Sequence, residues 1–474
     1  MMSYETMIGL EIHVELKTRT KMFCRCSAAF GREPNTSICP VCTGQPGALP
    51  SVNREAVLMG MVLALELHGN ILPVSRFDRK NYFYPDNPKS YQITQHFRPL
   101  STGGWLDIGG KHVRIHELHL EEDAGKLLHT PDGRTLVNLN RAGVPLAEIV
   151  TEPDFSSPEE VITFLTRLRD IVIYSGVSDG RMQEGSLRVD VNLSLKERSG
   201  SLGTRTEMKN LNSFTEIRHA IQHEAARQAK LLDSGMAVVQ ETRRWDESAG
   251  KSFSMRGKED ASDYRYFPEP DLYPLRITEE LLQEAARRRR EMRPEKKERF
   301  MSQFGLTDYA AGVVTEDPET ASLFEKTAVL SGDPKAVSSL IGTEVLRLIR
   351  ETGVPLSSSH LTPEIFSEIL VLQKNGKITG TVLKELLAAA YRAPLEVSSY
   401  VREKGLLTVA DPEALLSWVD EVIRENPGPV EQFLSGKEKV LMFLVGQVMK
   451  KAGGRADAET LKKMLPERLK KDRN

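Results

Sequence analysis

Apolar and polar residues alternate one by one along two segments of the chain. In residues 8–16 every second position is apolar, and the positions between them are polar: Glu11, His13 and Glu15. Residues 187–195 repeat the pattern, again with polar side chains at alternate positions: Arg188, Asp190, Asn192 and Ser194. A period of two is typical of a strand with one buried and one polar face. We therefore predict strands here, and a third strand around residues 118–123, which alternate in the same way.

Helix start signals occur at two places in the same half of the chain. Ser157, Pro158 and Glu160 form a capping box with proline in the first turn, and the apolar residues that follow keep a helical spacing up to Gly176. Ser213 and Glu216 form a second capping box, and we expect the helix that begins there to end near Gly235. From about residue 272 onward the pattern is helical almost throughout.

These patterns predict an α+β fold in three parts. We expect a large α+β domain on a mostly antiparallel sheet (1–293), an all-helical domain (294–404) and a small helical tail domain (405–474). The first boundary lies beside a basic segment, Arg287 to Arg290 followed by Arg293, Lys296 and Lys297.

Charge and composition narrow the class of protein. The 474 residues are 40% hydrophobic and 27% charged with a formal net charge of −2, so any affinity for nucleic acid must come from a local basic patch. The stretch from Lys437 onward is such a patch, although a solvated helix face is an equally good interpretation. No apolar run is long enough to span a membrane and no signal peptide is recognisable, so we expect a cytoplasmic protein.

The four cysteines of the chain lie close together in the sequence. Cys24 and Cys26 are separated by one residue, and after twelve more residues Cys39 and Cys42 are separated by two. Two such pairs can present four thiolates to a tetrahedral zinc ion, and four thiolates leave no open position for a substrate. We predict a structural zinc knuckle, with four reduced structural thiols as the alternative.

Acidic residues recur on the polar faces of the predicted strands. Carboxylates of this kind can bind Mg²⁺ together with phosphate oxygens; the candidates are Glu11, Glu121, Glu122, Glu148 and Asp190, with His13 among them. The wet face of an antiparallel sheet gives the same alternation without any function. Two nearby segments, residues 78–89 and 207–213, add lysine, asparagine and tyrosine, which suit phosphate and carboxylate groups.

Two common catalytic motifs are missing from the sequence. Gly250-Lys251-Ser252 resembles the end of a P-loop, but the first glycine of that motif would fall at Trp245. No Gly-x-Ser-x-Gly string is present, so an acyl-transfer nucleophile is not indicated. If the chain uses ATP, we expect it to bind on a sheet surface that carries carboxylates and a metal.

Long strings of the chain resemble the GatB family, which is the B subunit of the tRNA-dependent aspartyl/glutamyl-tRNA(Asn/Gln) amidotransferase. They include ETMIGLEIHVEL (5–16), FDRKNYFYPDNPK (77–89), LEEDAGK (120–126), NRAGVPLAEIVTEPD (140–154), EGSLR (184–188), KNLNSF (209–214), QETRR (240–244), DYRYFPEPD (263–271) and FLVGQVMK (443–450). The resemblance implies a cradle-like catalytic domain, a helical domain and a small tail domain that contacts tRNA. It implies a heterotrimer with a glutaminase A subunit and a small C subunit. It also implies ATP-dependent phosphorylation of the Glu or Asp carboxylate on mischarged tRNA(Gln) or tRNA(Asn), and then amidation by ammonia from the A subunit.

The resemblance also suggests roles for single residues. It implies that Mg²⁺ is held by four of them, Glu11, His13, Glu122 and Glu148, with Glu121 and Asp190 nearby. Lys80 would neutralise phosphate, and the weaker candidates for nucleotide binding are Arg188, Glu207 and Lys209. The chain departs from the family pattern at Asn138, where an aspartate is usual, and at Ala147, where a larger apolar residue is usual.

Two other functions remain open from the sequence. A non-catalytic tRNA-binding or assembly protein would work through the zinc knuckle and the basic tail, and would not need acidic residues that converge on one spot. A free-standing ligase that makes its own ammonia is disfavoured, because a glutaminase motif is missing.

Overall fold

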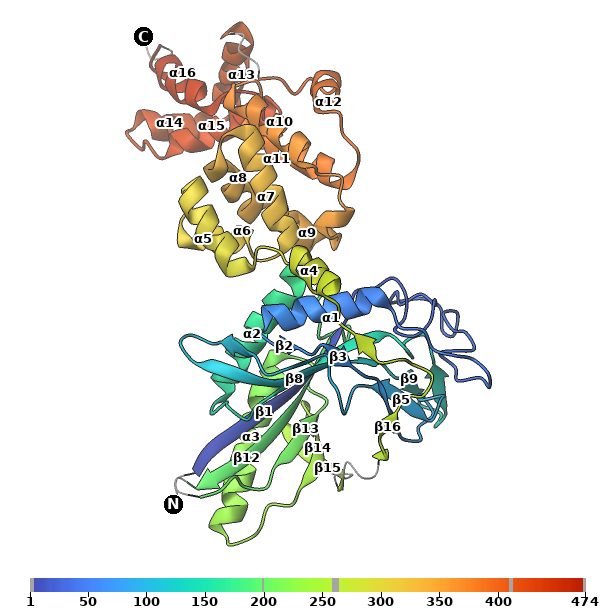
Figure 1. Cartoon of the computed structure of the whole chain (residues 1–474). Coiled ribbons are helices and arrows are strands. Elements are labelled where there is room, and N and C mark those ends of the chain that lie inside the picture. Colours follow the sequence, from blue (N-terminus) through green and yellow to red (C-terminus); the bar gives the residue numbers. More distant parts are fainter. Residues whose placement is uncertain (1–3, 198–199, 258–263, 409–411, 472–474) are drawn as a thin grey trace. The chain divides into compact units, whose positions relative to one another are not determined.

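The segments with alternating polarity form the centre of a large mixed sheet. β1 (Tyr4–Glu15) pairs antiparallel with β12 (Leu187–Glu197) on one side and with β11 (Pro145–Thr151) on the other. β11 pairs antiparallel with β8 (His112–Glu122). The three strands predicted from the alternation are therefore confirmed; β1 and β12 are neighbours although they are far apart in the sequence, and β8 is separated from β1 by β11 (Figure 1).

The sheet continues beyond these four strands in both directions. Its strand order is β15-β14-β13-β12-β1-β11-β8-β6-β2, with β7 paired to β8. Among the residues that the structure describes, the β13–β14 pair is the only parallel pair of this sheet. The added strands are β2 (Asn70–Ile71), β6 (Ser101–Thr102), β7 (Trp105–Asp107), β13 (Thr206–Lys209), β14 (Glu241–Asp246) and β15 (Lys251–Gly257).

Smaller sheets flank the main one. A hairpin pairs β9 with β10, a three-stranded sheet has the order β16-β4-β5, and β3 pairs with β17. Their bounds are β3 (Val74–Ser75), β4 (Asp78–Asn81), β5 (Tyr91–Thr94), β9 (Lys126–His129), β10 (Thr135–Asn138), β16 (Phe267–Pro268) and β17 (Leu275–Arg276).

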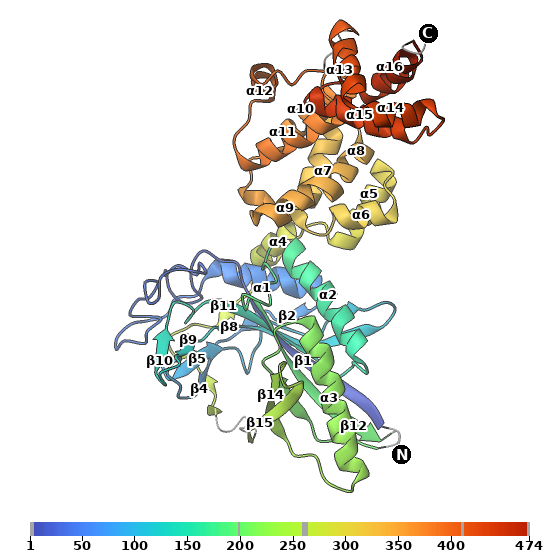
Figure 2. The same cartoon turned by 180° about the vertical axis from the view of Figure 1, so that it is seen from behind.

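Helices cover one face of the main sheet. α2 (Pro158–Tyr174) and α3 (Phe214–Asp233) begin at the predicted caps, because Ser157 accepts a hydrogen bond from the Glu160 N–H and Ser213 from the Glu216 N–H. α1 (Arg54–Glu66) completes this layer, α4 (Glu279–Arg288) packs on α1, and α2 and α3 lie side by side (Figure 2). Arg288 and Arg289 of the basic segment form ion pairs with the acids of α1, Glu55 and Glu66.

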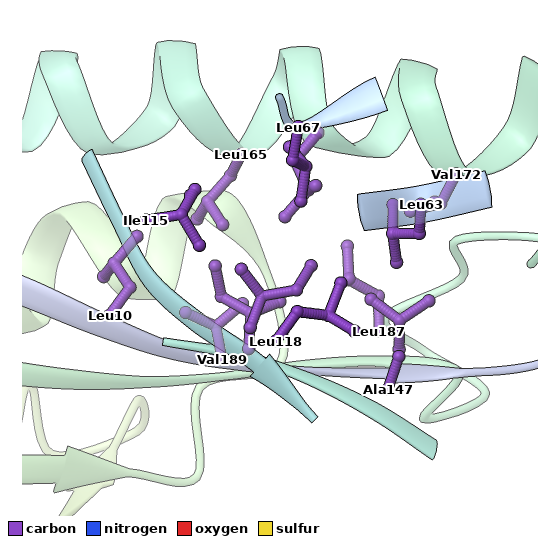
Figure 3. Close-up of a cluster of buried hydrophobic side chains, with 14 of the residues drawn as sticks. Leu10, Leu63, Leu67, Ile115, Leu118, Ala147, Leu165, Val172, Leu187 and Val189 are labelled. Atoms are coloured by element: carbon purple, nitrogen blue, oxygen red, sulfur yellow. The ribbon is translucent and has the colours of Figure 1, made fainter. Parts of the chain in front are cut away.

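The core lies between these helices and the sheet (Figure 3). Leu63, Leu165 and Val172 of the helices face the buried side chains of the central strands, which are Leu10, Leu118, Ala147, Leu187 and Val189. Since neighbouring residues of a strand point to opposite faces, the polar residues between these positions must lie on the other face of the sheet. That face carries the candidate site.

The second half of the chain is helical. Its elements are α5 (Arg293–Phe304), α6 (Asp308–Val314), α7 (Pro318–Ser331), α8 (Pro334–Leu340), a π-helical turn (Ile341–Val345), α9 (Leu346–Thr352), a 3₁₀ turn (Leu356–Ser358), α10 (Pro363–Lys374), α11 (Gly380–Arg392), α12 (Val397–Glu403), α13 (Pro412–Glu425), α14 (Pro427–Leu434), α15 (Val440–Lys451) and α16 (Ala458–Lys471). Two separate apolar clusters fill it, one within residues 300–406 and one within residues 415–469.

The computed structural model describes residues 4–197, 200–257, 264–408 and 412–471. The chain forms two compact units, Met1–Met292 and Arg293–Asn474. The α+β class is confirmed, whereas the bounds of the three domains stay a prediction. Asp263 of the string 263–271 and Arg473 of the basic tail lie outside the described residues. None of the helices that the described residues form combines the length and the apolar character needed to cross a lipid bilayer.

Candidate active site

One row of polar residues runs across four strands of the sheet. The antiparallel register places His13 of β1 opposite both Glu148 of β11 and Arg188 of β12, and it places Glu148 opposite His119 of β8. The next row along β1 pairs Glu11 with Asp190 of β12. Residues from distant parts of the chain thus meet on the face that the helices leave uncovered.

The first row gathers a histidine between two carboxylates. His13 Nε2 lies 3.3 Å from Glu121 Oε1 and 3.5 Å from Glu148 Oε2, and His119 Nε2 lies 2.8 Å from Glu148 Oε2. Burial alone would lower the pKa of His13, but the Glu148 charge and hydrogen bonds with Glu121 and Glu148 raise it to about 10. The pKa of His119 is raised to about 10 by the same balance of burial and carboxylates. Both carboxylates therefore lie in a setting that favours a bound cation.

A second carboxylate group lies beside the first. Glu11, Asp190 and Glu207 each offer an oxygen within 4.8 Å of the others. Asn192 donates a hydrogen bond to Glu11 at 2.9 Å, and Thr242 donates one to Glu207 at 2.8 Å. Burial, followed by the charges of Glu148 and Glu207, raises the pKa of Glu11. The carboxylates of the two groups repel one another, and a cation between them would relieve that repulsion.

Three basic side chains face the same space. Lys209 Nζ lies 2.6 Å from Asp190 and 3.2 Å from Glu207, and Arg188 Nη2 lies 2.9 Å from Asp123. Burial would lower the pKa of Lys80, but the charges of Glu121, Tyr266 and Glu148 outweigh it and raise that pKa. Fixed cations in a partly buried site suit phosphate oxygens.

These groups line one cavity of about 600 Å³, which we call the sheet cavity. Its lining includes every pocket residue predicted from the sequence except Glu122: Glu11, His13, Lys80, Glu121, Glu148, Arg188, Asp190, Glu207 and Lys209. Tyr82, Tyr84 and Tyr264 add aromatic rings to this charged lining. The cavity can therefore hold a charged ligand that also has an apolar part.

Glu122 does not lie with the other predicted residues. It follows Glu121 on β8, so its side chain points away from the cavity; it forms a buried ion pair with Lys89 and accepts a hydrogen bond from the Ile93 N–H at 2.9 Å. The two positions that depart from the family pattern also lie outside the lining. Asn138 accepts a hydrogen bond from the Asn140 N–H, and Ala147 is buried on the core face.

Both carboxylate groups fit a divalent cation by the chemistry of their donors. His13, Glu121 and Glu148 offer ligand atoms within 4.8 Å of one another. A set made only of oxygens, as in Glu11, Asp190 and Glu207, suits Mg²⁺, whereas an imidazole in the set also suits first-row metals.

The four cysteines also come together. Their sulfur atoms lie within 4.8 Å of one another, and Cys39 Sγ is 3.9 Å from Cys42 Sγ. Zn–S bonds of about 2.3 Å in a tetrahedron place two sulfurs nearly 4 Å apart, so this spacing fits a zinc ion. The cluster is separate from the sheet cavity, since no cysteine is part of the cavity lining.

Two of the residues that sequence reasoning missed contact the cavity carboxylates directly. His119 contacts Glu148, and its signal was its position two residues before Glu121 on the same strand. Thr242, which holds Glu207, lies on β14 and had no local signal, because β14 reaches the cavity only through its parallel pairing with β13.

Comparisons with known proteins agree over the whole chain. A family model described as the GatB/GatE catalytic domain matches residues 6–283, and one described as the GatB domain matches residues 322–469. Relatives named as the B subunit of aspartyl/glutamyl-tRNA(Asn/Gln) amidotransferase come from Agathobacter rectalis (46% identical over 475 residues) and Caldanaerobacter subterraneus subsp. tengcongensis (47% over 475 residues). Each alignment covers 99% of this chain and 100% of the relative.

Proposed function

Because the chain belongs to the GatB family, and is thus a subunit of a tRNA-dependent amidotransferase, we propose that the sheet cavity is its carboxylate-activating site. The observation that carries this proposal is the convergence of metal-binding carboxylates and phosphate-binding cations in one cavity. The relatives' name says that they act on tRNA(Asn) and tRNA(Gln) charged with aspartate or glutamate. We propose the same substrates for this chain.

The reaction needs activation because a carboxylate is a poor electrophile. Its oxygen attacks the γ-phosphorus of ATP, and ADP leaves, so that an acyl phosphate forms. Ammonia then attacks the carbonyl carbon, the C–O bond to phosphate breaks, and the departing phosphate carries away one proton from nitrogen. The product is the amide, Gln or Asn, still esterified to tRNA. Charge on the transferring phosphoryl group is the main barrier that the site must lower.

The cavity residues divide into two roles in this proposal. Lys80, Lys209 and Arg188 position and neutralise phosphate oxygens, and Tyr84 and Tyr264 exclude water from one side. Glu11, Asp190 and Glu207 would hold Mg²⁺ through oxygens alone. His13, Glu121 and Glu148 form the other candidate set, in which His13 would bind the ion only in its deprotonated form. Bound Mg²⁺ would supply further positive charge to the phosphates. His119 fixes Glu148 by a direct contact.

We propose that the ammonia comes from partner subunits. The sequence holds no glutaminase motif, so this chain would assemble with a glutaminase A subunit and a small C subunit. Zn²⁺ in the four-cysteine cluster and a cytoplasmic location belong to the same proposal. The basic patch from Lys437 onward would contact tRNA through its phosphates.

A non-catalytic tRNA-binding role is the second candidate. The basic tail favours it, but such a protein has no use for a cavity lined by two carboxylate groups. The two candidates therefore differ in whether the cavity is needed for amidation.

The test is ATP-dependent conversion of Glu-tRNA(Gln) to Gln-tRNA(Gln) by the full chain with its A and C partners, using ammonium chloride in place of glutamine. Glu148→Gln should lower the rate by about 100-fold or more, since it removes a charge from the proposed metal set. Glu152→Gln is the matched control, because Glu152 follows the same strand but pairs with His116 at the surface. Near-normal activity of Glu148→Gln, with tRNA binding intact, would favour the binding role.

A further inference from the structure

Lys21 is a fully buried lysine beside the cysteine cluster. Its side chain is 0% exposed, its Nζ lies 3.6 Å from Cys42 Sγ, and it donates a hydrogen bond to the Leu139 carbonyl at 3.3 Å. The ion pairs found among the described residues do not include Lys21. A buried ammonium is costly unless an anion lies nearby, so the neighbouring sulfur is the group that can stabilise it.

The charge of a filled cysteine cluster matches this need. Four thiolates around one divalent ion carry a net charge of −2, in a place where Cys42 is itself buried. Lys21 is a cation in direct contact with that centre, and the Cys39 N–H, 3.2 Å from Cys42 Sγ, adds a second donor. Groups that donate to metal ligands fix their position and raise metal affinity.

Lys21 also holds the loop of residues 139–143, which lies between the cysteine cluster and β11. Leu139 begins the loop before β11, and other knuckle residues hold the same loop: the Met22 N–H donates to the Gly143 carbonyl at 2.7 Å, and the Ser37 N–H donates to Asn140 Oδ1 at 2.9 Å. The cysteine-containing segment is thus tied to residues 139–143 at several points.

The loop in turn holds an acid that lines the sheet cavity. The Gly143 N–H donates to the Asp123 carbonyl at 2.8 Å, and the Asp123 N–H donates to the Val144 carbonyl at 2.8 Å. The Asp123 carboxylate pairs with Arg188 at 2.9 Å, and both residues line the cavity. Lys21 is therefore connected to Arg188 through one loop and one acid.

We propose that Lys21 is a positioning residue that supplies the counter-charge of the four-cysteine metal centre and ties this centre to the catalytic cavity. This inference rests on the proposed zinc site and on the proposed role of the cavity. It goes beyond them, because it makes the knuckle a support of the cavity and not a separate RNA-binding module.

The first test measures zinc affinity of the full chain by competition with a coloured chelator, without any activity assay. Lys21→Met keeps the length and burial of the side chain but removes the charge, and it should weaken zinc binding about 10- to 100-fold. Lys21→Arg should recover part of that loss. Lys17→Met is the matched control, because Lys17 is exposed on the same segment, and its zinc affinity should equal that of the parent.

The outcomes separate this inference from its premises. A parent chain that binds no zinc would overturn the metal centre and the inference together. A parent that binds zinc and a Lys21→Met variant that binds it equally well would overturn the counter-charge role alone. Thermal melting of the zinc-loaded variant checks that it is folded.

The second test addresses the connection to the cavity. In the assembled enzyme at limiting zinc, Lys21→Met should raise the KM for ATP severalfold with a smaller change in kcat, and saturating zinc should restore it. An unchanged KM in the zinc-poor variant would overturn the tie to the cavity. If the cavity itself is not the activating site, the proposed-function test with Glu148→Gln fails separately.

Discussion

Thr206 and Glu207 are neighbours on β13, but they belong to two very different groups of buried charge. Thr206 points toward α3, where it donates a hydrogen bond to Glu224 at 2.7 Å. Glu224 also accepts hydrogen bonds from Arg227 and Gln228, and these bonds outweigh burial, so the pKa of Glu224 is lowered. Glu207 points into the sheet cavity on the other face.

The cavity group is balanced only in part: Lys209 pairs with Asp190 and Glu207, but the shift at Glu11 shows that its charge is not fully compensated. Glu11 shares the cavity with Glu207, and burial and neighbouring carboxylates raise its pKa, which is the opposite of the shift at Glu224. A buried polar network whose members are all paired stabilises a fold, whereas a cluster of like charges costs stability and persists where function requires it. Burial and charge together are therefore not enough to identify a functional site. What marks the cavity is buried charge that the neighbouring side chains do not fully compensate.

The largest effect should come from breaking the balanced group. Glu224→Ala leaves Arg227, Gln228 and Thr206 without their shared acceptor, so the free energy of unfolding should fall by about 3 kcal/mol or more. Urea denaturation of the full chain measures this change. The amidation rate per folded molecule should stay near that of the parent. If the rate falls as much as the stability does, the Glu224 group and the cavity group do not differ in function.

In the cavity, the loss of activity should exceed the loss of stability. Glu121→Gln should lower amidation about 100-fold, because it removes a proposed metal ligand beside His13. Burial and the Glu148 charge would raise the pKa of Glu121, but its contact with His13 and the charge of Lys80 outweigh them and lower it, so the carboxylate is stabilised in the folded state. Glu121→Gln should therefore also reduce the free energy of unfolding, but by less than Glu224→Ala does. Amidation with ammonium chloride and a melting curve on the same sample test both parts. A melting temperature that falls as it does for Glu224→Ala would assign Glu121 to the scaffold.

Lowering the pH should reduce the stability that Glu224 and its hydrogen-bond partners contribute to the fold. The folded-state pKa of Glu224 lies below its unfolded value, so its contribution to stability is present above the unfolded pKa of about 4.3 and is lost as pH falls through the folded pKa. Glu224→Gln should be less stable than the parent by about 1–3 kcal/mol at pH 7. Urea midpoints between pH 7 and pH 3 should show this gap closing. A gap that is constant with pH would mean that the charge of Glu224 is unimportant.

The smallest effect concerns the support of a single carboxylate. Thr242→Val removes the hydroxyl that donates to Glu207 and keeps the shape of the side chain. Loss of one such bond is worth about 1 kcal/mol, so the Mg²⁺ concentration needed for half-maximal amidation should rise about fivefold. Ser252→Ala on β15, whose hydroxyl bonds Arg243 and not a cavity carboxylate, is the control. Equal Mg²⁺ requirements for both variants would remove Thr242 from the site.

Local signals in the sequence predicted much of the fold. The alternation in residues 8–16 and 187–195 gave two central strands, and the capping boxes at Ser157 and Ser213 gave two helices. α1 was not predicted, although Asn53 caps it. Apolar residues lie on every side of this buried helix, so its sequence shows no alternation of apolar and polar faces from which a helical period could be read. Propensity and pattern report local preference, and burial on several sides removes the contrast on which the pattern depends.

The residues of the candidate site could be predicted only in part from local sequence patterns. Period-two alternation already implied that Glu121 and Glu122 point to opposite faces, so only one of them could share a cavity with His13. The resemblance named both, and the structure places only Glu121 in the cavity lining. The residues that meet there depend on strand register between segments far apart in the chain, and no local pattern contains that register.

The place of β1 at the centre of the sheet has a consequence for the time course of synthesis. Glu11 and its partner Asn192 are separated by 181 residues, and β11 lies between them in the sequence. At about 5–20 residues per second, a ribosome needs roughly 10–40 s to make that stretch. Both edges of β1 lack a partner strand until β11 is made, and the edge that pairs with β12 stays open until the end of this delay. The strand that carries His13 must therefore be shielded from aggregation before its neighbours exist, and the chain should depend on chaperones most strongly while residues 16–190 are being translated.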